Sequence, residues 1–156
     1  MARPPLGQPA MLLATAGGIG LLPWAPGTWG SLVGVGLAWL LVPRLGIMGM
    51  LAVCFALFLA GWWAAARVAR ASGTADPGYV VIDEVVGQGL VLAAIPPSTV
   101  GYVGGFVLFR LFDIIKPWPI NMIERRFRNG LGIMADDLMA AVYAMLILYV
   151  SLRLLA

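Results

Sequence analysis

Residues 47–66 read IMGMLAVCFALFLAGWWAAA, a run of apolar residues without a single charged side chain. A helix of about 20 apolar residues spans the hydrocarbon core of a bilayer. The whole chain has the same character, because 62% of its 156 residues are hydrophobic and 11% are charged, against roughly 25% charged residues in a soluble domain. Since backbone groups in lipid must bond to one another, the sequence predicts an all-α, multi-pass helical membrane bundle.

Further apolar segments lie on both sides of this run. They cover residues 31–42, 80–95, 99–115 and 136–155, and prolines follow two of them at Pro96, Pro97 and Pro117. We therefore expect about four to five apolar helices in a single domain, residues 1–156. Residues 11–22 are apolar but rich in glycine, and we expect a re-entrant or interfacial segment there rather than a span.

The composition excludes several classes of function. The chain has no His and a single Cys, Cys54, which lies within an apolar run. A disulfide framework, imidazole metal ligands and His-dependent catalysis are therefore excluded. The chain also lacks the clustered basic stripe of a nucleic-acid-binding domain.

The basic residues are distributed unequally between the two predicted membrane faces. With the N-terminus on the inner side, seven fall inside and two outside. The inner ones are Arg3, Arg67, Arg70, Lys116, Arg125, Arg126 and Arg128, and the outer ones are Arg44 and Arg153.

The acidic residues gather at the same inner helix ends. We expect Asp83 and Glu84 to open one helix, Asp113 to close the next, and Asp136 and Asp137 to open the last. Each group has a local explanation as well, either stabilisation by a helix N-terminus or pairing with neighbouring basic residues. Antiparallel helices nevertheless bring these ends to one level, and ionisable groups in apolar helices usually mark a functional site. The sequence thus predicts five carboxylates that converge just inside the interface.

Oxygen ligands without His or Cys favour a hard cation such as Mg²⁺, which binds a few carboxylates together with substrate phosphate. Residues 25–31, APGTWGS, precede the first long apolar helix. We expect Thr28 or Ser31 to cap that helix, so that its free N–H groups can bind an anion. Arg110 and Lys116 would add cationic donors.

Together these features indicate phosphate chemistry on a lipid head group. The chain has no phosphate-binding loop of the GxxxxGK[ST] type and no Cys in a basic loop. Metal-assisted displacement remains, with a metal-activated water as the attacking group or, alternatively, an Asp as nucleophile. A small cation transporter or channel subunit with an acidic inner mouth is the competing hypothesis, and a phosphatase for another lipid phosphate is a further one.

Four stretches, APGTWGS, DEVVG, FRLFDIIKPWPI and GIMADD, occur in this order between about residues 17 and 143. Together they resemble the motif blocks of the phosphatidylglycerophosphatase A family. The resemblance implies a Mg²⁺-dependent enzyme that converts phosphatidylglycerophosphate to phosphatidylglycerol. It also implies a place in the bacterial inner (cytoplasmic) membrane, with the active site facing the cytoplasm and the anionic lipid bilayer as surroundings.

The resemblance and the residue chemistry together give the expected site. Catalytic and metal-binding roles are expected for Asp83, Glu84, Asp113, Asp136 and Asp137. Phosphate-binding roles are expected for Thr28, Gly30, Ser31, Arg110 and Lys116. This sequence lacks the His that often precedes the Asp-Glu block of the family, and it has Ala141 where a Gly often stands.

Overall fold

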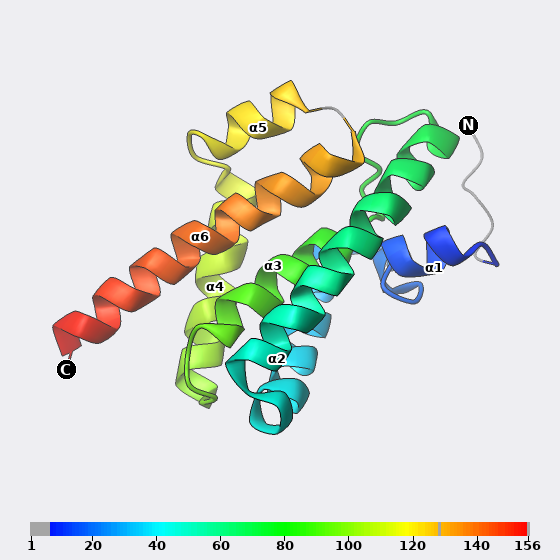
Figure 1. Ribbon diagram of the computed structural model, residues 1–156. Helices are drawn as coiled ribbons and strands as arrows, with labels where there is room; N and C mark the ends of the chain where they lie inside the picture. Colours follow the sequence, from blue (N-terminus) through cyan, green and yellow to red (C-terminus); the bar gives the residue numbers. More distant parts are fainter. Residues whose placement is uncertain (1–6, 128, 156) are drawn as a thin grey trace.

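The computed structural model describes residues 7–127 and 129–155, and every regular element in these ranges is a helix (Figure 1). The elements are α1 (Pro9–Ala14), η1 (Ile19–Leu21), α2 (Pro26–Ser72), α3 (Ile82–Ala93), α4 (Thr99–Ile115), α5 (Ile120–Arg126) and α6 (Gly130–Leu155). The prediction of an all-α fold is confirmed.

The first two expected apolar segments form one helical element that folds back on itself. Within α2, Gly46 has φ 66° and ψ −176°, which is not a helical conformation and which glycine adopts readily. Pro43 comes just before it. Figure 1 shows the chain reversing at this point, so α2 consists of a first arm, residues 26–45, and a second arm, residues 47–72.

Helix α3 packs against both arms of α2. A Cβ added to Gly34 of the first arm would lie 2.8 Å from the Val85 carbonyl oxygen, and one added to Gly61 of the second arm would lie 3.0 Å from the Ile82 side chain. A Cβ on Gly89 of α3 would in turn lie 3.0 Å from the Cys54 sulfur. Small residues at these contacts allow the helix backbones to approach closely, as they do in membrane helix bundles.

Helices α4 and α6 meet α3 near its middle. A Cβ on Gly87 would lie 2.7 Å from the ring of Phe109 in α4 and 3.2 Å from the carbonyl oxygen of Asp137 in α6. Phe109 is fully buried. Figure 1 shows α6 crossing the bundle obliquely, with its C-terminal end extending away from the other helices.

The structure differs from the sequence expectations at the start of the last helix and in one additional short helix. Helix α6 begins at Gly130, so Asp136 and Asp137 lie in its second turn instead of opening the helix. The short helix α5 was not expected, because seven residues give too little periodicity to detect. Residues 11–22 are divided between α1, a loop and η1. Both helices are too short to span a bilayer, in agreement with the expectation that this segment is not a span.

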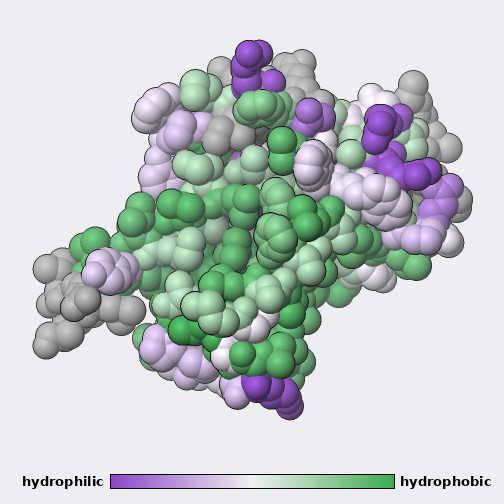
Figure 2. All heavy atoms as spheres, viewed as in Figure 1, coloured by the Kyte–Doolittle hydropathy of each residue, from purple (hydrophilic) through white to green (hydrophobic). Residues whose placement is uncertain are grey.

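The surface of the molecule suits a membrane. Within the described ranges two helices are long and apolar enough to cross one, α2 and residues Gly130–Ser151 of α6. Large apolar side chains such as Met48 and Phe55 are 77% and 65% exposed. Figure 2 shows a broad hydrophobic band between hydrophilic groups at opposite ends of the molecule. The chain is therefore membrane-associated, and the expected four to five spans stay a prediction.

Candidate metal and phosphate site

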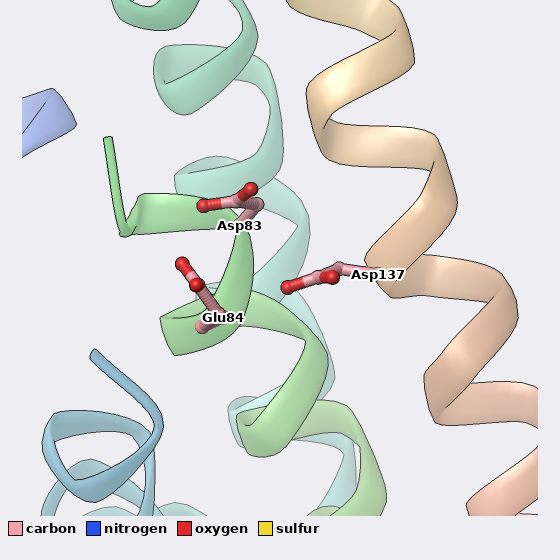
Figure 3. A group of neighbouring side chains, drawn as sticks. All are labelled: Asp83, Glu84 and Asp137. Atoms are coloured by element: carbon pink, nitrogen blue, oxygen red, sulfur yellow. The ribbon is translucent and has the colours of Figure 1, made fainter. Parts of the chain in front are cut away.

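Three carboxylates from two helices meet at one end of the bundle. Asp83 and Glu84 lie in the first turn of α3, and Asp137 extends from α6 toward them (Figure 3). One oxygen atom from each side chain lies within 4.8 Å of the other two. We call Asp83, Glu84 and Asp137 the carboxylate triad.

The triad is buried and carries oxygens without partners. Asp83 is 9% exposed and Asp137 is 2% exposed. Asp83 Oδ1, Glu84 Oε2 and Asp137 Oδ2 accept no hydrogen bond from the residues that the structure describes. Buried polar atoms are normally bonded, so these three oxygens are suited to bind an external partner. A divalent cation is such a partner, because hard cations bind carboxylate oxygens.

The electrostatics of α3 agree with this interpretation. Asp83 and Glu84 lie at the start of a helix that does not span a bilayer on its own, because α3 is only 12 residues long, about 18 Å. Burial, followed by repulsion from Glu84 and Asp137, raises the pKa of Asp83 well above its usual value. Burial likewise raises the pKa of Glu84 to about 7, although Asp83 and Arg110 act in the opposite direction. A bound cation would stabilise the ionised forms of both groups.

The two other predicted carboxylates have cationic partners. Asp113 accepts a short hydrogen bond from Arg110 Nη1, three residues earlier on α4. Asp136 Oδ2 lies 2.6 Å from Lys116 Nζ. Arg110 Nη1 also lies 3.8 Å from Glu84 Oε1, so this guanidinium connects Asp113 to the triad.

Lys116 pairs with Asp136 from the C-terminal end of α4. It ends α4 in the left-handed region, with φ 45° and ψ 60°, which costs a residue other than glycine about 1 kcal/mol. Helix α4 therefore stops at this residue, and the Lys116 side chain pairs with a carboxylate on α6.

The start of α2 contributes a polar contact to the site, through the Ser31 side chain and not through a helix cap. Ser31 Oγ accepts a hydrogen bond of 3.4 Å from Arg110 Nη1 and donates one of 3.0 Å to the Gly27 carbonyl oxygen. The expectation that Thr28 or Ser31 caps the helix is wrong, because α2 already begins at Pro26 and its N-cap residue, Ala25, makes no side-chain hydrogen bond.

Of the ten predicted site residues, eight make contacts with one another in the site, and Thr28 and Gly30 do not. Thr28 is half-buried in the first turn of α2 and makes no side-chain hydrogen bond within the described residues. Gly30 lies inside α2, where a Cβ would be 2.8 Å from Val81, so its evident role is the contact between α2 and α3. The other eight form the triad, the two ion pairs and the Ser31 contact.

Two glycines that shape the site were not selected from the sequence. A Cβ on Gly27 would lie 2.1 Å from Glu84 Oε1 and 3.1 Å from Arg110 Nη1. Gly87 lets α6 approach α3 at Asp137. The only sequence signal for Gly27 was its place in the APGTWGS stretch, and Gly87 had a comparable signal in DEVVG.

Comparisons with known proteins identify the family of the chain. The family model for phosphatidylglycerophosphatase A matches residues 12–152. A phosphatidylglycerophosphatase A of Haemophilus influenzae is 42% identical over 143 residues, covering 91% of this chain and 88% of the relative. The phosphatidylglycerophosphatase A of Escherichia coli is 37% identical over 154 residues, covering 95% and 86%.

A relative from Bacteroides thetaiotaomicron, provisionally named a phosphatidylinositol-3-phosphatase, is 37% identical over 149 residues. The alignment covers 90% of this chain and 92% of the relative. No solved structure matches the chain. On the family match and these identities, the chain belongs to the phosphatidylglycerophosphatase A family.

Proposed function

We propose that this enzyme removes the terminal phosphate of phosphatidylglycerophosphate and leaves phosphatidylglycerol. Membership of the family makes the chain a phosphatase, a phosphoric monoester hydrolase, in phospholipid biosynthesis. The observation that carries the substrate assignment is the match over residues 12–152, which includes the triad, both ion pairs and Ser31. The transporter hypothesis has no comparable support.

Mg²⁺ is the proposed cofactor, and Asp83, Glu84 and Asp137 would hold it, with Asp113 and Asp136 beside them. The unpartnered triad oxygens support this assignment. When bound, the cation would neutralise charge on the phosphate and favour ionisation of a water molecule.

The chain's own residues would bind and orient the phosphate. Arg110 has its Nη1 atom between Ser31 Oγ, Asp113 and Glu84, and charge-assisted donors of this kind bind phosphate oxygens strongly. Lys116 would add a second positive charge from the end of α4. In our proposal Thr28 lies beside this anion site, and Gly30 allows α2 and α3 to pack closely beneath it.

Hydrolysis breaks the bond between phosphorus and the glycerol oxygen, and water supplies the new oxygen on phosphorus. In our proposal a carboxylate oxygen of the site that does not bind the cation accepts the proton of that water. The proton finally resides on the hydroxyl of the product glycerol. General-base catalysis of this type typically contributes about 10²–10⁴-fold to the rate.

We propose that the enzyme lies in the bacterial inner membrane as a multi-pass protein, with its site facing the cytoplasm. The unequal distribution of basic residues supports this orientation. The triad lies at the start of α3, beside the beginning of α2. Arg44 lies near the Gly46 reversal, at the opposite end of the first arm.

A second substrate deserves a place in the test, because the Bacteroides relative is named for action on a phosphoinositide. Purified enzyme with Mg²⁺ is assayed for release of inorganic phosphate from phosphatidylglycerophosphate, phosphatidic acid and phosphatidylinositol 3-phosphate in matched mixed micelles. We expect kcat/KM to be highest for phosphatidylglycerophosphate. Equal or higher values for either other lipid would overturn the substrate assignment.

A further inference from the structure

An apolar groove runs along the outside of the bundle, between the first arm of α2 and α4. It has a volume of about 260 Å³. Its walls include Leu32, Val35 and Trp39 from α2 and Tyr102, Val103 and Phe106 from α4. None of these side chains carries a charge, and Leu32 and Val103 are 42% and 58% exposed.

The groove and the proposed phosphate site lie along the same two helices, the first arm of α2 and α4. At one end Arg110 Nη1 contacts Ser31 Oγ at 3.4 Å, and this contact joins the two helices. At the other end the rings of Trp39 and Tyr102 meet edge to face, with centroids 5.4 Å apart. The two contacts are eight residues apart on both helices, about 12 Å, so the helices run antiparallel with the groove between them.

A cationic side chain of α4 lies next to the Phe106 end of the groove. This guanidinium already serves the proposed site, and Phe106 lies one turn from Arg110 on the same face of α4. Leu32 directly follows Ser31 on α2. Beyond this point the walls are apolar and open to the surroundings of the bundle. The complementary ligand has an anionic group joined to a long hydrocarbon chain.

We propose that one fatty acyl chain of the substrate lies in this groove while its phosphate reaches Arg110. The inference rests on the proposed function, since it assumes a phosphorylated lipid as the substrate. A phosphate at Arg110 would lie close to the carboxylate triad, because Arg110 Nη1 is 3.8 Å from Glu84 Oε1. Apolar burial of the chain would then contribute to substrate binding and not to the chemical step.

The kinetic test compares a groove variant with a matched control. Val103→Trp and Leu32→Trp place a bulky ring in the groove. Val107→Trp makes the same change as Val103→Trp one turn along α4, where Val107 is 55% exposed and outside the groove walls. Each variant is assayed on long-chain phosphatidylglycerophosphate and on its water-soluble, deacylated head group.

We expect the groove variants to raise KM for the long-chain lipid about tenfold, with kcat unchanged. The deacylated substrate should be hydrolysed equally by the parent enzyme, both groove variants and Val107→Trp. Groove variants that match the parent on the long-chain lipid, or that lose the same factor on both substrates, would overturn the acyl-chain assignment.

A binding measurement separates this proposal from the substrate assignment. A phosphatidic acid with a photoactivatable diazirine in its acyl chain is cross-linked to the protein in micelles, and the labelled peptides are identified by mass spectrometry. We expect labelling of residues 32–39 and 99–106 that falls at least threefold in Val103→Trp and stays constant in Val107→Trp. Unchanged labelling in Val103→Trp would overturn the groove, whichever lipid phosphate proves to be the substrate.

Discussion

The five carboxylates of the site fall into two groups that differ in their partners. Asp113 and Asp136 each contact a cationic side chain, Arg110 and Lys116 respectively. Asp83 and Asp137 have none of these contacts, and their oxygens Oδ1 and Oδ2 are buried without a partner among the described residues. Glu84 lies between the two groups, with Arg110 at 3.8 Å.

This difference indicates that the two groups of carboxylates have different roles. A buried charge is costly unless something compensates it. The paired acids are compensated by the chain itself, so they suit the positioning of Arg110 and Lys116. Asp83 and Asp137 of the triad have no such cationic partner among the described residues, so they suit an external cation. Four experiments test this division, from the largest expected effect to the smallest.

Removal of the cation tests the triad as a whole. We expect EDTA to lower the rate of phosphate release at least about 10³-fold, and Mg²⁺ to restore it. Because a ligand that binds only the folded state stabilises that state, Mg²⁺ should also raise Tm. The measurements are phosphate release and a thermal melt in detergent, and a rate insensitive to EDTA would contradict the cation site.

The second experiment removes one charge from the triad. We expect Asp137→Asn to lower kcat by about 10²–10⁴-fold, while Tm without metal stays constant or rises, because an uncompensated buried charge is lost. Asp83→Asn should behave in the same way. The comparison of kcat with Tm checks this, and activity near the parent level in either variant would exclude that residue from the site.

Breaking an ion pair should have the opposite effect on stability. Lys116→Met leaves Asp136, which is 4% exposed, without its cationic partner. We expect a loss of about 1–3 kcal/mol in the free energy of unfolding and a fall of about 10–100-fold in activity, as for residues that support ligands.

The double variant Lys116→Met, Asp136→Leu is the matched control for that pair. It should recover much of the stability, because no charge is left unpaired, but none of the activity. Recovery of activity would show that the pair serves folding alone.

The smallest effect concerns the space around Glu84. In Gly27→Ala the new Cβ would lie 2.1 Å from Glu84 Oε1, so the Glu84 side chain has to move. We expect activity to fall about tenfold, since small displacements of catalytic groups are costly. Gly36→Ala is the control, because a Cβ at Gly36 meets nothing within 4 Å; equal activities for the two variants would contradict a spatial role for Gly27.

Much of the fold and site was accessible from the sequence. Apolar composition predicted an all-helical protein in lipid, and the bounds expected for one helix, residues 99–115, are those of α4. The order of the motif stretches and the positions of acids near helix ends predicted that the carboxylates would meet. These are local properties, because hydrophobicity, helix propensity and the breaking of helices by proline depend on near neighbours.

Other features depended on how the helices pack. The sequence offered five similar carboxylates, and only the arrangement of α3, α4 and α6 separated Asp83 and Asp137 from the paired Asp113 and Asp136. The helix-capping role expected for Thr28 or Ser31 was wrong because α2 begins at Pro26, and Ser31 instead contacts Arg110, 79 residues further along the chain. The fold-back at Gly46 and the space left by Gly27 likewise became visible only in three dimensions.

The sequence by itself therefore predicted a lipid environment for this protein, its helical class and the family to which its motifs point. Tertiary structure decided which side chains compensate one another and which side chains of α2 and α4 line an apolar groove. The physical reason is range: burial and helix formation follow from a residue and its neighbours along the chain, whereas the pairing of buried charges depends on distances of a few ångströms between helices that are far apart in sequence.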